Sequence, residues 1–457
     1  FLRKLEAALY STWRFNFSKK ACTEFMKKEK SPYQEAVTYL YSLQKFGIKF
    51  GLSKTANLLE ALGNPHKGQQ YIHIAGTNGK GSVGAFLSSI LKEAGLKVGL
   101  YSYNNLLRFT ERFRINGREI TDEKAAFLIE KLRNIFVHED PPTFFEATTA
   151  MALACFAGEK TDIAIMETGM GGRLDATNVI DPIVSVITNI AMEHQFFLGN
   201  SLLQIASEKG GIIKKGVDVI TGATQPPVIN LFQSICSEKG ATLFRVGRDI
   251  RYRTSGSWFH YYGMGRRLNG LELNLKGKFQ RRNAAMAIAV IERLGKKGFK
   301  VSSGDIREGL KNSVWPGRMQ VMAQNPTILL DGGHNAAAMR ALAESIKAEF
   351  QYRRLILVLG VMKDKDIGQM LKGIVPQSDY VIYTRPVYYR AADPEILMAK
   401  AASLETPGEV VSTLAQAIDR AKEMAGPQDL IVVCGSLFTV GEAMACIDPE
   451  TNVPDTF

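Results

Sequence analysis

Cysteine is scarce in this chain, and its cysteines are not paired in sequence. The 457 residues contain five of them, with no C-x-x-C spacing. An odd number of scattered thiols argues against both a disulfide framework and a zinc site. We therefore expect a protein of the reducing cytoplasm. The cysteines are Cys22, Cys155, Cys236, Cys434 and Cys446.

The sequence also lacks a long apolar run. No stretch of about 18 uncharged apolar residues is present to span a bilayer, so we expect no membrane partner. Residues 1–25 lack the continuous apolar region and the small-residue cleavage site of a secretory signal. We expect residues 1–30 to form a loosely ordered N-terminal extension, with Met26 as the authentic start.

Acidic residues are outnumbered by basic ones. The chain has 57 Lys and Arg against 45 Asp and Glu, a formal charge of +12, and residues 1–30 hold eight basic residues against three acidic ones. This excess favours anionic partners such as phosphates and polycarboxylates. No RNA-recognition signature and no basic-aromatic stripe is present, so we expect no nucleic-acid partner.

The chain is longer than one hydrophobic core usually supports, which predicts two domains. Pro316 ends a predicted helix, and a new series of strands and helices begins after it, so we place the boundary there. We expect a central α/β domain with a mainly parallel sheet over residues 31–315. A smaller Rossmann-like C-terminal α/β domain should occupy residues 316–457.

Apolar runs bounded by turn residues predict the strands of both domains. Between residues 242 and 278 the pattern changes to strand-like alternation, which predicts an antiparallel appendage. Parallel strands are expected at 71–75, 162–166 and 183–188 and, in the second domain, at 327–331, 355–359, 380–383 and 430–433. The alternation includes 250–253 and 271–275. Helices are expected at 33–46, 82–94, 201–208 and 283–294.

A glycine-rich segment between a strand and a helix predicts a phosphate loop. Glycines let successive N–H groups and the helix N-terminus converge on phosphate oxygens, Lys80 adds a positive charge, and the Ser82 hydroxyl can hold Mg²⁺. The spacing is shorter than the common G-x-x-x-x-G-K-[ST] form. An ordinary glycine-rich turn with an incidental lysine is the alternative. The loop comprises Gly76, Thr77, Asn78, Gly79, Lys80, Gly81 and Ser82.

Three further residues are candidate metal ligands. Glu167 ends a predicted buried strand, where a carboxylate can hold Mg²⁺, although an ion pair with Arg173 is the alternative. His194 and Lys209 carry little signal alone, since a lone histidine is more often structural and a lysine at a helix end complements the dipole. Beside divalent cations Lys209 would be repelled, unless its amine reacts with CO₂ to form a carbamate anion.

The second predicted domain places charged groups at a strand end. Open parallel sheets bind ligands at this edge. There Arg318 can stabilise a transferring phosphoryl group, and His334 can contact an anionic acceptor. A surface arginine and a helix-capping residue within 331–335 are the alternative.

Taken together, these motifs resemble the folylpolyglutamate synthase and dihydrofolate synthase family, within the Mur ligase superfamily. The resemblance covers about residues 31–445. One departure is the segment 103–105, which reads Tyr-Asn-Asn where the family commonly has Ser-Pro-His. The motifs that carry the resemblance lie at 73–83, 108–112, 143–146, 167–178, 208–214, 316–318 and 330–335.

The resemblance implies a Mur-ligase-type ATPase domain and an ADP-forming ligase. In that family ATP phosphorylates a pteroate or folate carboxylate, and the amino group of L-glutamate attacks the acyl phosphate. Two Mg²⁺ ions, a monovalent cation such as K⁺ and a carbamylated Lys209 are implied, and a monomer is expected. A peptidoglycan Mur ligase and a catalytically silent nucleotide-binding regulator stay open as alternatives.

The resemblance also assigns roles to single residues. Glu167, His194 and Lys209 would hold metal together with Ser82, and Asn283 would contact adenine. Arg318 and Asp331 would contact the nucleotide from the second domain, while His334 and Ser436 would contact the incoming glutamate. Thr143, Phe145 and Asp175 would lie near the pterin.

Overall fold

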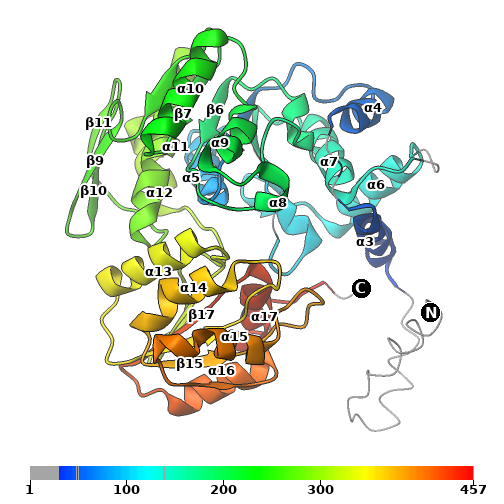
Figure 1. The fold of residues 1–457 in the computed structure, drawn as a ribbon. Coiled ribbons are helices and arrows are strands. Elements are labelled where there is room, and N and C mark those ends of the chain that lie inside the picture. The colour runs from blue at the N-terminus through cyan, green and yellow to red at the C-terminus, as the bar shows by residue number, and fades with distance from the viewer. Residues whose placement is uncertain (1–29, 48, 50, 104, 137–139, 456–457) are drawn as a thin grey trace.

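The computed structural model describes residues 30–47, 49, 51–103, 105–136 and 140–455. Residues 1–29 of the predicted N-terminal extension, including Met26, lie outside these residues. Two large sheets and one small sheet make up the described chain. In Figure 1 the first large sheet and its helices occupy the upper part of the molecule, and the second large sheet lies below them.

The first large sheet has eight strands in the order β4-β3-β2-β5-β1-β6-β7-β8. The six strands from β2 to β8 in this order pair in parallel, and β3 and β4 are antiparallel additions at one edge. The three strands predicted in this region are confirmed. The strands are β1 (Tyr71–Ala75), β2 (Val98–Tyr101), β3 (Phe113–Ile115), β4 (Arg118–Glu119), β5 (Ile163–Glu167), β6 (Val184–Ile187), β7 (Asp218–Thr221) and β8 (Leu243–Arg245).

Helices cover both faces of this sheet because its central strands are buried on both sides. One face packs against α5 (Lys80–Glu93), α11 (Lys278–Lys296) and α12 (Ser303–Lys311). The other face packs against α7 and its neighbours and against α9 and α10. Their bounds are α3 (Pro32–Ser42), α4 (Ser53–Ala61), α6 (Asp122–Arg133), α7 (Phe144–Gly158), α9 (Leu202–Gly210) and α10 (Pro226–Glu238).

The small sheet is the antiparallel appendage that the sequence predicts. It has the order β11-β10-β9 and lies at the left edge of the view in Figure 1. Its strands are β9 (Arg251–Ser255), β10 (Trp258–Tyr262) and β11 (Arg267–Leu271). The expected strand at 271–275 is wrong beyond Leu271, where β11 ends. Helix α11 begins at Lys278, five residues before the predicted start.

The second large sheet has the order β12-β13-β17-β14-β15-β16, with β12 antiparallel and the rest parallel. Its four predicted strands are confirmed, whereas the short edge strands β12 and β16 were not predicted. The strands are β12 (Gln320–Ala323), β13 (Thr327–Asp331), β14 (Leu355–Leu359), β15 (Tyr380–Tyr383), β16 (Gly408–Val410) and β17 (Leu430–Cys434). Its helices are α13 (Ala336–Glu349), α14 (Ile367–Ile374), α15 (Pro394–Ala401), α16 (Leu414–Met424) and α17 (Leu437–Ile447).

The remaining short helices lie in connections. The 3₁₀ turn η1 extends α3, so the predicted helix at 33–46 is α-helical only to Ser42. The short helices are α8 (Gln195–Leu198), η1 (Leu43–Phe46), η2 (Phe109–Arg112), η3 (Ala176–Val179), η4 (Val375–Gln377) and η5 (Ala402–Leu404). Within the described ranges, no helix is both long and apolar enough to cross a membrane.

The two large sheets share packing near residue 106. Leu106 and Leu107 follow β2 of the first sheet, yet they pack against the core under the second sheet. The carboxylate of Glu111 holds this loop by accepting the N–H groups of Leu106, Leu107 and Arg108, each at 2.8 Å. The domain division at residue 316 stays a prediction.

Candidate active site between the two large sheets

In the loop between β1 and α5, two glycines lie in close contact with neighbouring side chains. A Cβ atom on Gly79 would lie 2.6 Å from Asn283 Oδ1, and one on Gly81 would lie within 2.9 Å of the Trp315 ring. Gly79 also has a φ of 88°, a left-handed conformation that favours glycine. Only a backbone without side chains can approach its surroundings this closely.

Backbone and side-chain hydrogen bonds fix the first half of this loop. The carbonyl oxygen of Asn189 accepts from Thr77 N at 2.9 Å, and its Oδ1 accepts from Asn78 N at 2.8 Å. The Thr188 hydroxyl donates to the Asn78 carbonyl at 2.7 Å. The first N–H groups of α5 have no acceptor within the helix, and they lie at its positive end. The segment therefore has the geometry of an anion-binding loop.

Two lysines converge on one carbonyl oxygen of the loop. Lys80 Nζ donates to the Gly76 and Thr77 carbonyls at 3.1 and 3.3 Å, and Lys209 Nζ donates to the Gly76 carbonyl at 2.8 Å. Lys209 is almost completely buried. Burial first, and the nearby charge of Lys80 second, lower the pKa of Lys209 to about 7. Its amine is therefore neutral in a substantial fraction of molecules near pH 7.

Glu167 ends β5 beside this loop. Its Oε1 lies 3.9 Å from Lys80 Nζ, and burial raises the pKa of the carboxyl group against the opposing charges of Lys80 and Arg318. The alternative pairing with Arg173 is wrong, because Arg173 instead pairs with Glu208 at 2.8 Å. Glu167 thus faces the loop.

Ser82 and Asn283 are linked through Gln280. Gln280 Nε2 donates to the Ser82 hydroxyl at 3.1 Å, and Asn283 Nδ2 donates to Gln280 Oε1 at 2.9 Å. All three side chains are buried. Helix α11 therefore positions the amide of Asn283 against Gly79.

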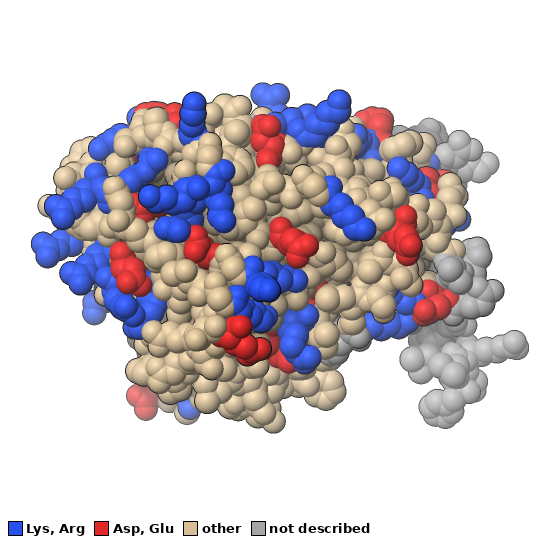
Figure 2. Space-filling model, turned by 90° about the horizontal axis from the view of Figure 1, so that it is seen from above, with Lys and Arg blue, Asp and Glu red and all other residues tan. Residues whose placement is uncertain are grey.

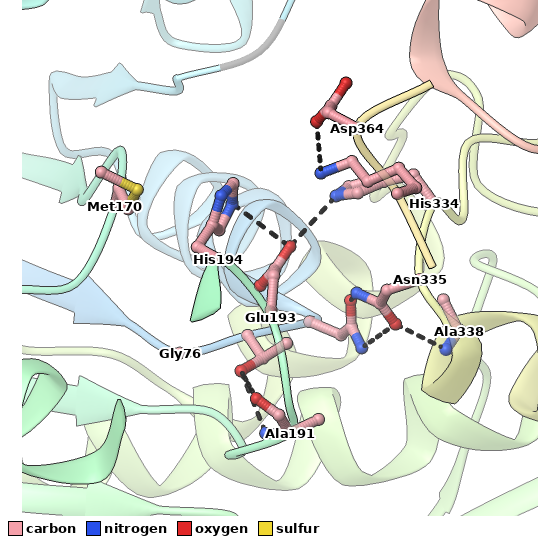
Figure 3. A network of polar contacts seen from close by, with 12 residues as sticks. Gly76, Met170, Ala191, Glu193, His194, His334, Asn335, Ala338 and Asp364 are labelled. Atoms are coloured by element: carbon pink, nitrogen blue, oxygen red, sulfur yellow. Dashed lines mark hydrogen bonds and ion pairs between the residues drawn. The ribbon is translucent and has the colours of Figure 1, made fainter. Parts of the chain in front are cut away.

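Glu193 joins the two halves of the site. Its Oε1 lies 3.5 Å from His194 Nε2 and 3.4 Å from His334 Nε2, and Figure 3 shows it between the two rings. Burial alone would raise the pKa of Glu193, but its contacts with the two histidines hold the pKa well below the usual range. Burial and nearby lysines lower the pKa of His194 to about 4, against the charge of Glu193.

A second link pairs two amide side chains. Asn78 Nδ2 donates to Asn335 Oδ1 at 3.2 Å, and Asn335 Nδ2 donates to Asn78 Oδ1 at 2.9 Å. Asn335 Oδ1 also caps α13 by accepting from Ala338 N at 2.9 Å. The phosphate-type loop, which comprises residues 76–82, is thus hydrogen-bonded directly to the N-cap residue of α13, beside the second large sheet (Figure 3).

Arg318 and Asp331 lie on the second-sheet side. Asp331 Oδ1 accepts from Gly333 N at 2.8 Å, and Oδ2 accepts from Met319 N at 3.0 Å. Burial raises the pKa of Asp331, and the charge of Arg318 opposes this. Asp331 therefore fixes the turn that carries Arg318, while Arg318 stays near Glu167 as well.

A small cavity connects the two sides. Its volume is about 40 Å³, and Glu167 and Gly81 line it from the first sheet, while Arg318 and Leu437 line it from the second. Trp315 lies in the same wall. The cleft thus brings a strand-end carboxylate and an arginine to one space.

The remaining predicted site residues are Thr143, Phe145, Asp175 and Ser436, and each of them makes local structural contacts. Thr143 and Ser436 cap α7 and α17, and within the described ranges neither hydrogen-bonds to the loop. The Asp175 carboxylate accepts from Met170 N at 2.9 Å and Thr177 N at 3.0 Å, so it shapes the segment after β5. The Phe145 ring packs on this segment, because a Cβ on Gly169 would lie 2.7 Å from it.

The donor set fits Mg²⁺ only in part. In the part of the chain that the structure describes, no group of three His, Cys, Asp or Glu side chains is arranged to hold a metal ion. Mg²⁺, however, prefers oxygen donors and usually binds through one or two protein groups together with waters and phosphates. Ser82 and Glu167 supply such oxygens. His194 contacts Glu193 rather than Glu167.

Four residues of this site had no functional role assigned from the sequence, although a helix-capping residue within 331–335 was an alternative, and Asn335 caps α13. Glu193, Asn335, Gln280 and Trp315 hold the predicted residues in place. Glu193 directly precedes His194, and Asn335 directly follows His334, so both could have been suspected from their neighbours. Gln280 and Trp315 carry no motif of their own.

Family comparisons cover most of the described chain. Residues 74–291 match the Mur ligase middle domain, and residues 317–437 match the Mur ligase, glutamate ligase domain. The chain is 33% identical to the dihydrofolate synthase/folylpolyglutamate synthase of Bacillus subtilis over 429 residues, which are 90% of this chain and 98% of that protein.

An archaeal relative is longer. The probable bifunctional folylpolyglutamate synthase/dihydropteroate synthase of Haloferax volcanii is 34% identical over 428 residues, which are 90% of this chain. The chain spans about half the length of that protein, because the match covers 50% of it. The additional half of the relative therefore has no counterpart in the aligned residues.

Solved structures agree over the same extent. Escherichia coli FolC in complex with DHPP and ADP superposes with a TM-score of 0.83 at 33% identity, over 91% of this chain and 98% of that one. A bifunctional folylpolyglutamate synthase/dihydrofolate synthase with Mn, AMPPNP and L-glutamate bound gives a TM-score of 0.80 at 32% identity, over 90% and 98%. The expected α/β fold of the Mur ligase type is confirmed.

Proposed function

This chain belongs to the folylpolyglutamate synthase/dihydrofolate synthase family, and on that premise we propose that it is an ADP-forming ligase. It joins L-glutamate to dihydropteroate, to folates or to both through an acyl phosphate. One observation carries the proposal. A loop with the geometry of an anion-binding loop has Lys80 and Glu167 beside it, and Glu167 lines one cavity together with Arg318 from the second-sheet side.

The loop from Gly76 to Ser82 binds the phosphates of ATP. The free N–H groups at the start of α5 and the amine of Lys80 contact phosphate oxygens. Asn283, which Gln280 holds against Gly79, would contact adenine. The relatives with ADP or AMPPNP bound support nucleotide binding by this chain.

Ser82 and Glu167 offer oxygen ligands for Mg²⁺, and His194 and a carbamylated Lys209 would complete two ion sites. Bound Mg²⁺ neutralises phosphate charge and so makes phosphate a better leaving group. The relative with Mn bound supports the use of a divalent ion by this chain. A monovalent cation such as K⁺ is a further expected component.

Burial of Lys209 supports its carbamylation. An amine must be neutral to attack CO₂, and a pKa of about 7 leaves a substantial neutral fraction. The amine nitrogen forms a bond to the carbon of CO₂ and loses one proton, which gives a carbamate anion. The anion would replace a repelled cation with oxygen donors beside the loop.

Arg318 stabilises the charge of the transferring phosphoryl group, and Asp331 fixes the turn that carries it. His334 and Ser436 contact the incoming glutamate. Thr143, Phe145 and Asp175 form the pterin side, where Asp175 acts by shaping the segment after β5. The protein works as a cytoplasmic monomer, without a nucleic-acid or membrane partner.

The test is a product assay with the full chain. We incubate it with ATP, Mg²⁺, L-glutamate and either dihydropteroate or tetrahydrofolate, and we measure phosphate and the mass of the conjugate. With ¹⁸O in the acceptor carboxylate, one labelled oxygen should appear in the released phosphate. Nucleotide binding without phosphate release would instead indicate a silent regulator, and activity only with a muramoyl nucleotide a peptidoglycan ligase.

An Arg318→Ala variant sharpens the assignment of the cleft. It should lose turnover by about a hundredfold or more, since a preorganised charge at the transition state is removed, while some ATP binding is retained. Normal turnover would contradict the role of Arg318 without touching the ligase reaction itself.

A further inference from the structure

A second and much larger cavity lies against the small antiparallel sheet. Its volume is about 890 Å³, and its walls come from the turn after β8, from the strands of the small sheet and from the first half of α11. Five of its eleven lining residues are arginines, and Asp249 is the one acidic residue among them. The arginines are Arg248, Arg251, Arg253, Arg267 and Arg282.

Strand pairing places several of these residues on one face. Arg251 lies directly opposite Tyr262, and Tyr262 lies directly opposite Arg267, so three neighbouring strands form one row. Because adjacent strands are about 4.8 Å apart, the two arginine backbones are roughly 10 Å apart. Arg253 is two positions from Arg251 and shares its face. The row therefore presents cations on both sides of a tyrosine.

Few protein acceptors neutralise this set. Arg248 lies 3.4 Å from Asp249, and Arg282 donates to the Gly222 carbonyl at 3.1 Å. Within the described residues, the guanidinium groups of Arg253 and Arg267 have neither a hydrogen bond nor an ion pair. Like charges in one concave surface repel, and they raise the local concentration of anions.

The surface around the cavity is also basic. Figure 2 shows Lys and Arg side chains gathering on the left part of that face, which is the side of β9–β11 in Figure 1. Arginine is the side chain best suited to phosphate and carboxylate, because its planar fork donates two parallel hydrogen bonds. Tyr262, in the row of Arg251 and Arg267, and Tyr252, on the opposite face of β9, also line the pocket.

We propose that this pocket binds a small polyanion that carries at least two phosphate or carboxylate groups. An oligophosphate and the oligo-γ-glutamate chain of a folate share this chemistry. The pocket is separate from the reaction cleft, although Arg282 precedes Asn283, which packs on the phosphate loop. Two adjacent residues of helix α11 thus belong to the two sites.

Binding is tested by titration calorimetry on the full chain, in a phosphate-free buffer of low ionic strength. The probes are tripolyphosphate and tri-γ-L-glutamate. The pocket variant carries Arg251→Gln and Arg267→Gln, and the control carries Arg118→Gln and Arg340→Gln, which remove the same charge from two exposed positions. Unchanged melting temperatures establish that both variants fold.

We expect the wild type to bind one equivalent of a probe. The pocket variant should bind it about tenfold more weakly or worse, because charged hydrogen bonds are lost, and the control should stay within about twofold. The probe with the higher affinity identifies the source of the ligand. Since no turnover is measured, the result is independent of whether the chain is a ligase.

Three results would overturn the proposal. The first is that the wild type binds neither probe. The second is equal binding by the pocket variant and the wild type, or equal weakening in the pocket and control variants, since the probe then binds elsewhere or responds only to net charge. The third is tighter binding of a mixed-sequence RNA than of either probe, which would indicate a nucleic-acid surface.

Discussion

Helix α11 contacts two regions that are both suited to anions but are built in opposite ways. Asn283 packs on Gly79 of the loop between β1 and α5, which offers backbone N–H groups and in which Thr77 and Ser82 are buried. The preceding residue, Arg282, lines an open pocket rich in arginine side chains. The same helix turn therefore contacts one site built mainly from backbone groups and one built mainly from side chains.

The difference shows what burial does to a cation. Burial lowers the pKa of Lys209 to about 7, so its charge depends on what is bound beside it. A guanidinium group keeps its charge in any protein environment, and at an open surface salt screens it instead. We therefore expect the buried site to respond to geometry and the open site to respond to ionic strength.

Removal of Lys80 should give the largest effect. A Lys80→Ala variant loses the mobile cation that lies between the loop carbonyls and Glu167. Turnover should fall by about a thousandfold, as expected when a preorganised charge at a transferring phosphoryl group is lost. The rate of phosphate release at saturating ATP measures turnover. The control variant is Arg118→Ala, which also removes one positive charge, but from an exposed position. A fall of less than about tenfold would mean that backbone N–H groups suffice.

Two glycines give the second effect and separate packing from backbone strain. Gly79 has a φ of 88° and faces Asn283, whereas Gly247 has a φ of 96° and nothing within 4 Å. An alanine pays the left-handed strain at both positions, about 1 kcal/mol in each. Gly79→Ala also overpacks its site and should cost about 3 kcal/mol in total. Urea unfolding of Gly79→Ala and Gly247→Ala measures the loss of unfolding free energy in each. Equal losses would show that the loop can shift to make room for the added methyl group.

A buried histidine gives the third effect. Burial lowers the pKa of His73 to about 3, and its Nε2 lies 2.8 Å from the Thr177 hydroxyl. The unfolded chain takes up a proton near pH 6.5 while the folded chain does not. Above about pH 7.5, protonation of His73 therefore does not change the free energy of unfolding. As the pH falls below 6.5, protonation of His73 in the unfolded chain lowers the free energy of unfolding by about 1.4 kcal/mol per pH unit.

The variant His73→Gln isolates the contribution of His73 protonation to stability, because a glutamine amide does not titrate but can still hydrogen-bond to Thr177. The difference in unfolding free energy between wild type and variant should be flat above pH 7.5. As the pH falls from 6.5 to 5, the wild type should lose stability relative to the variant. A difference that stays constant over this range would mean that His73 is protonated in the folded protein.

The strands and the phosphate-type loop could be predicted because their signals are local. The apolar runs at 71–75 and 327–331 need no partner to be recognised, and Gly79 with Lys80 and Ser82 forms a continuous motif. The short edge strands β12 and β16 could not be predicted, since three or four residues without a buried position carry no periodicity.

Contacts between distant segments were also beyond the sequence. Glu193 meets His334, and Asn78 meets Asn335, only because the two sheets face each other. The arginine pocket needs the register of β9, β10 and β11, which alternation alone leaves free by one residue. The local motifs could thus be predicted from the sequence, whereas the contacts between residues of the two sheets could be known only from the structure.

Asp249 gives the smallest effect and tests whether the open site depends on net charge. It is the one carboxylate in the lining, and its Oδ2 accepts from Arg245 N at 2.9 Å, a bond that an asparagine oxygen can keep. Asp249→Asn should therefore tighten tripolyphosphate binding by about two- to fivefold at low salt, the scale of an exposed ion pair. The gain should vanish at high salt because screening removes it, and Glu123→Gln serves as a distant control. Weaker binding in Asp249→Asn would instead mean that this carboxylate orients Arg248, so that geometry governs the open site as it does the buried one.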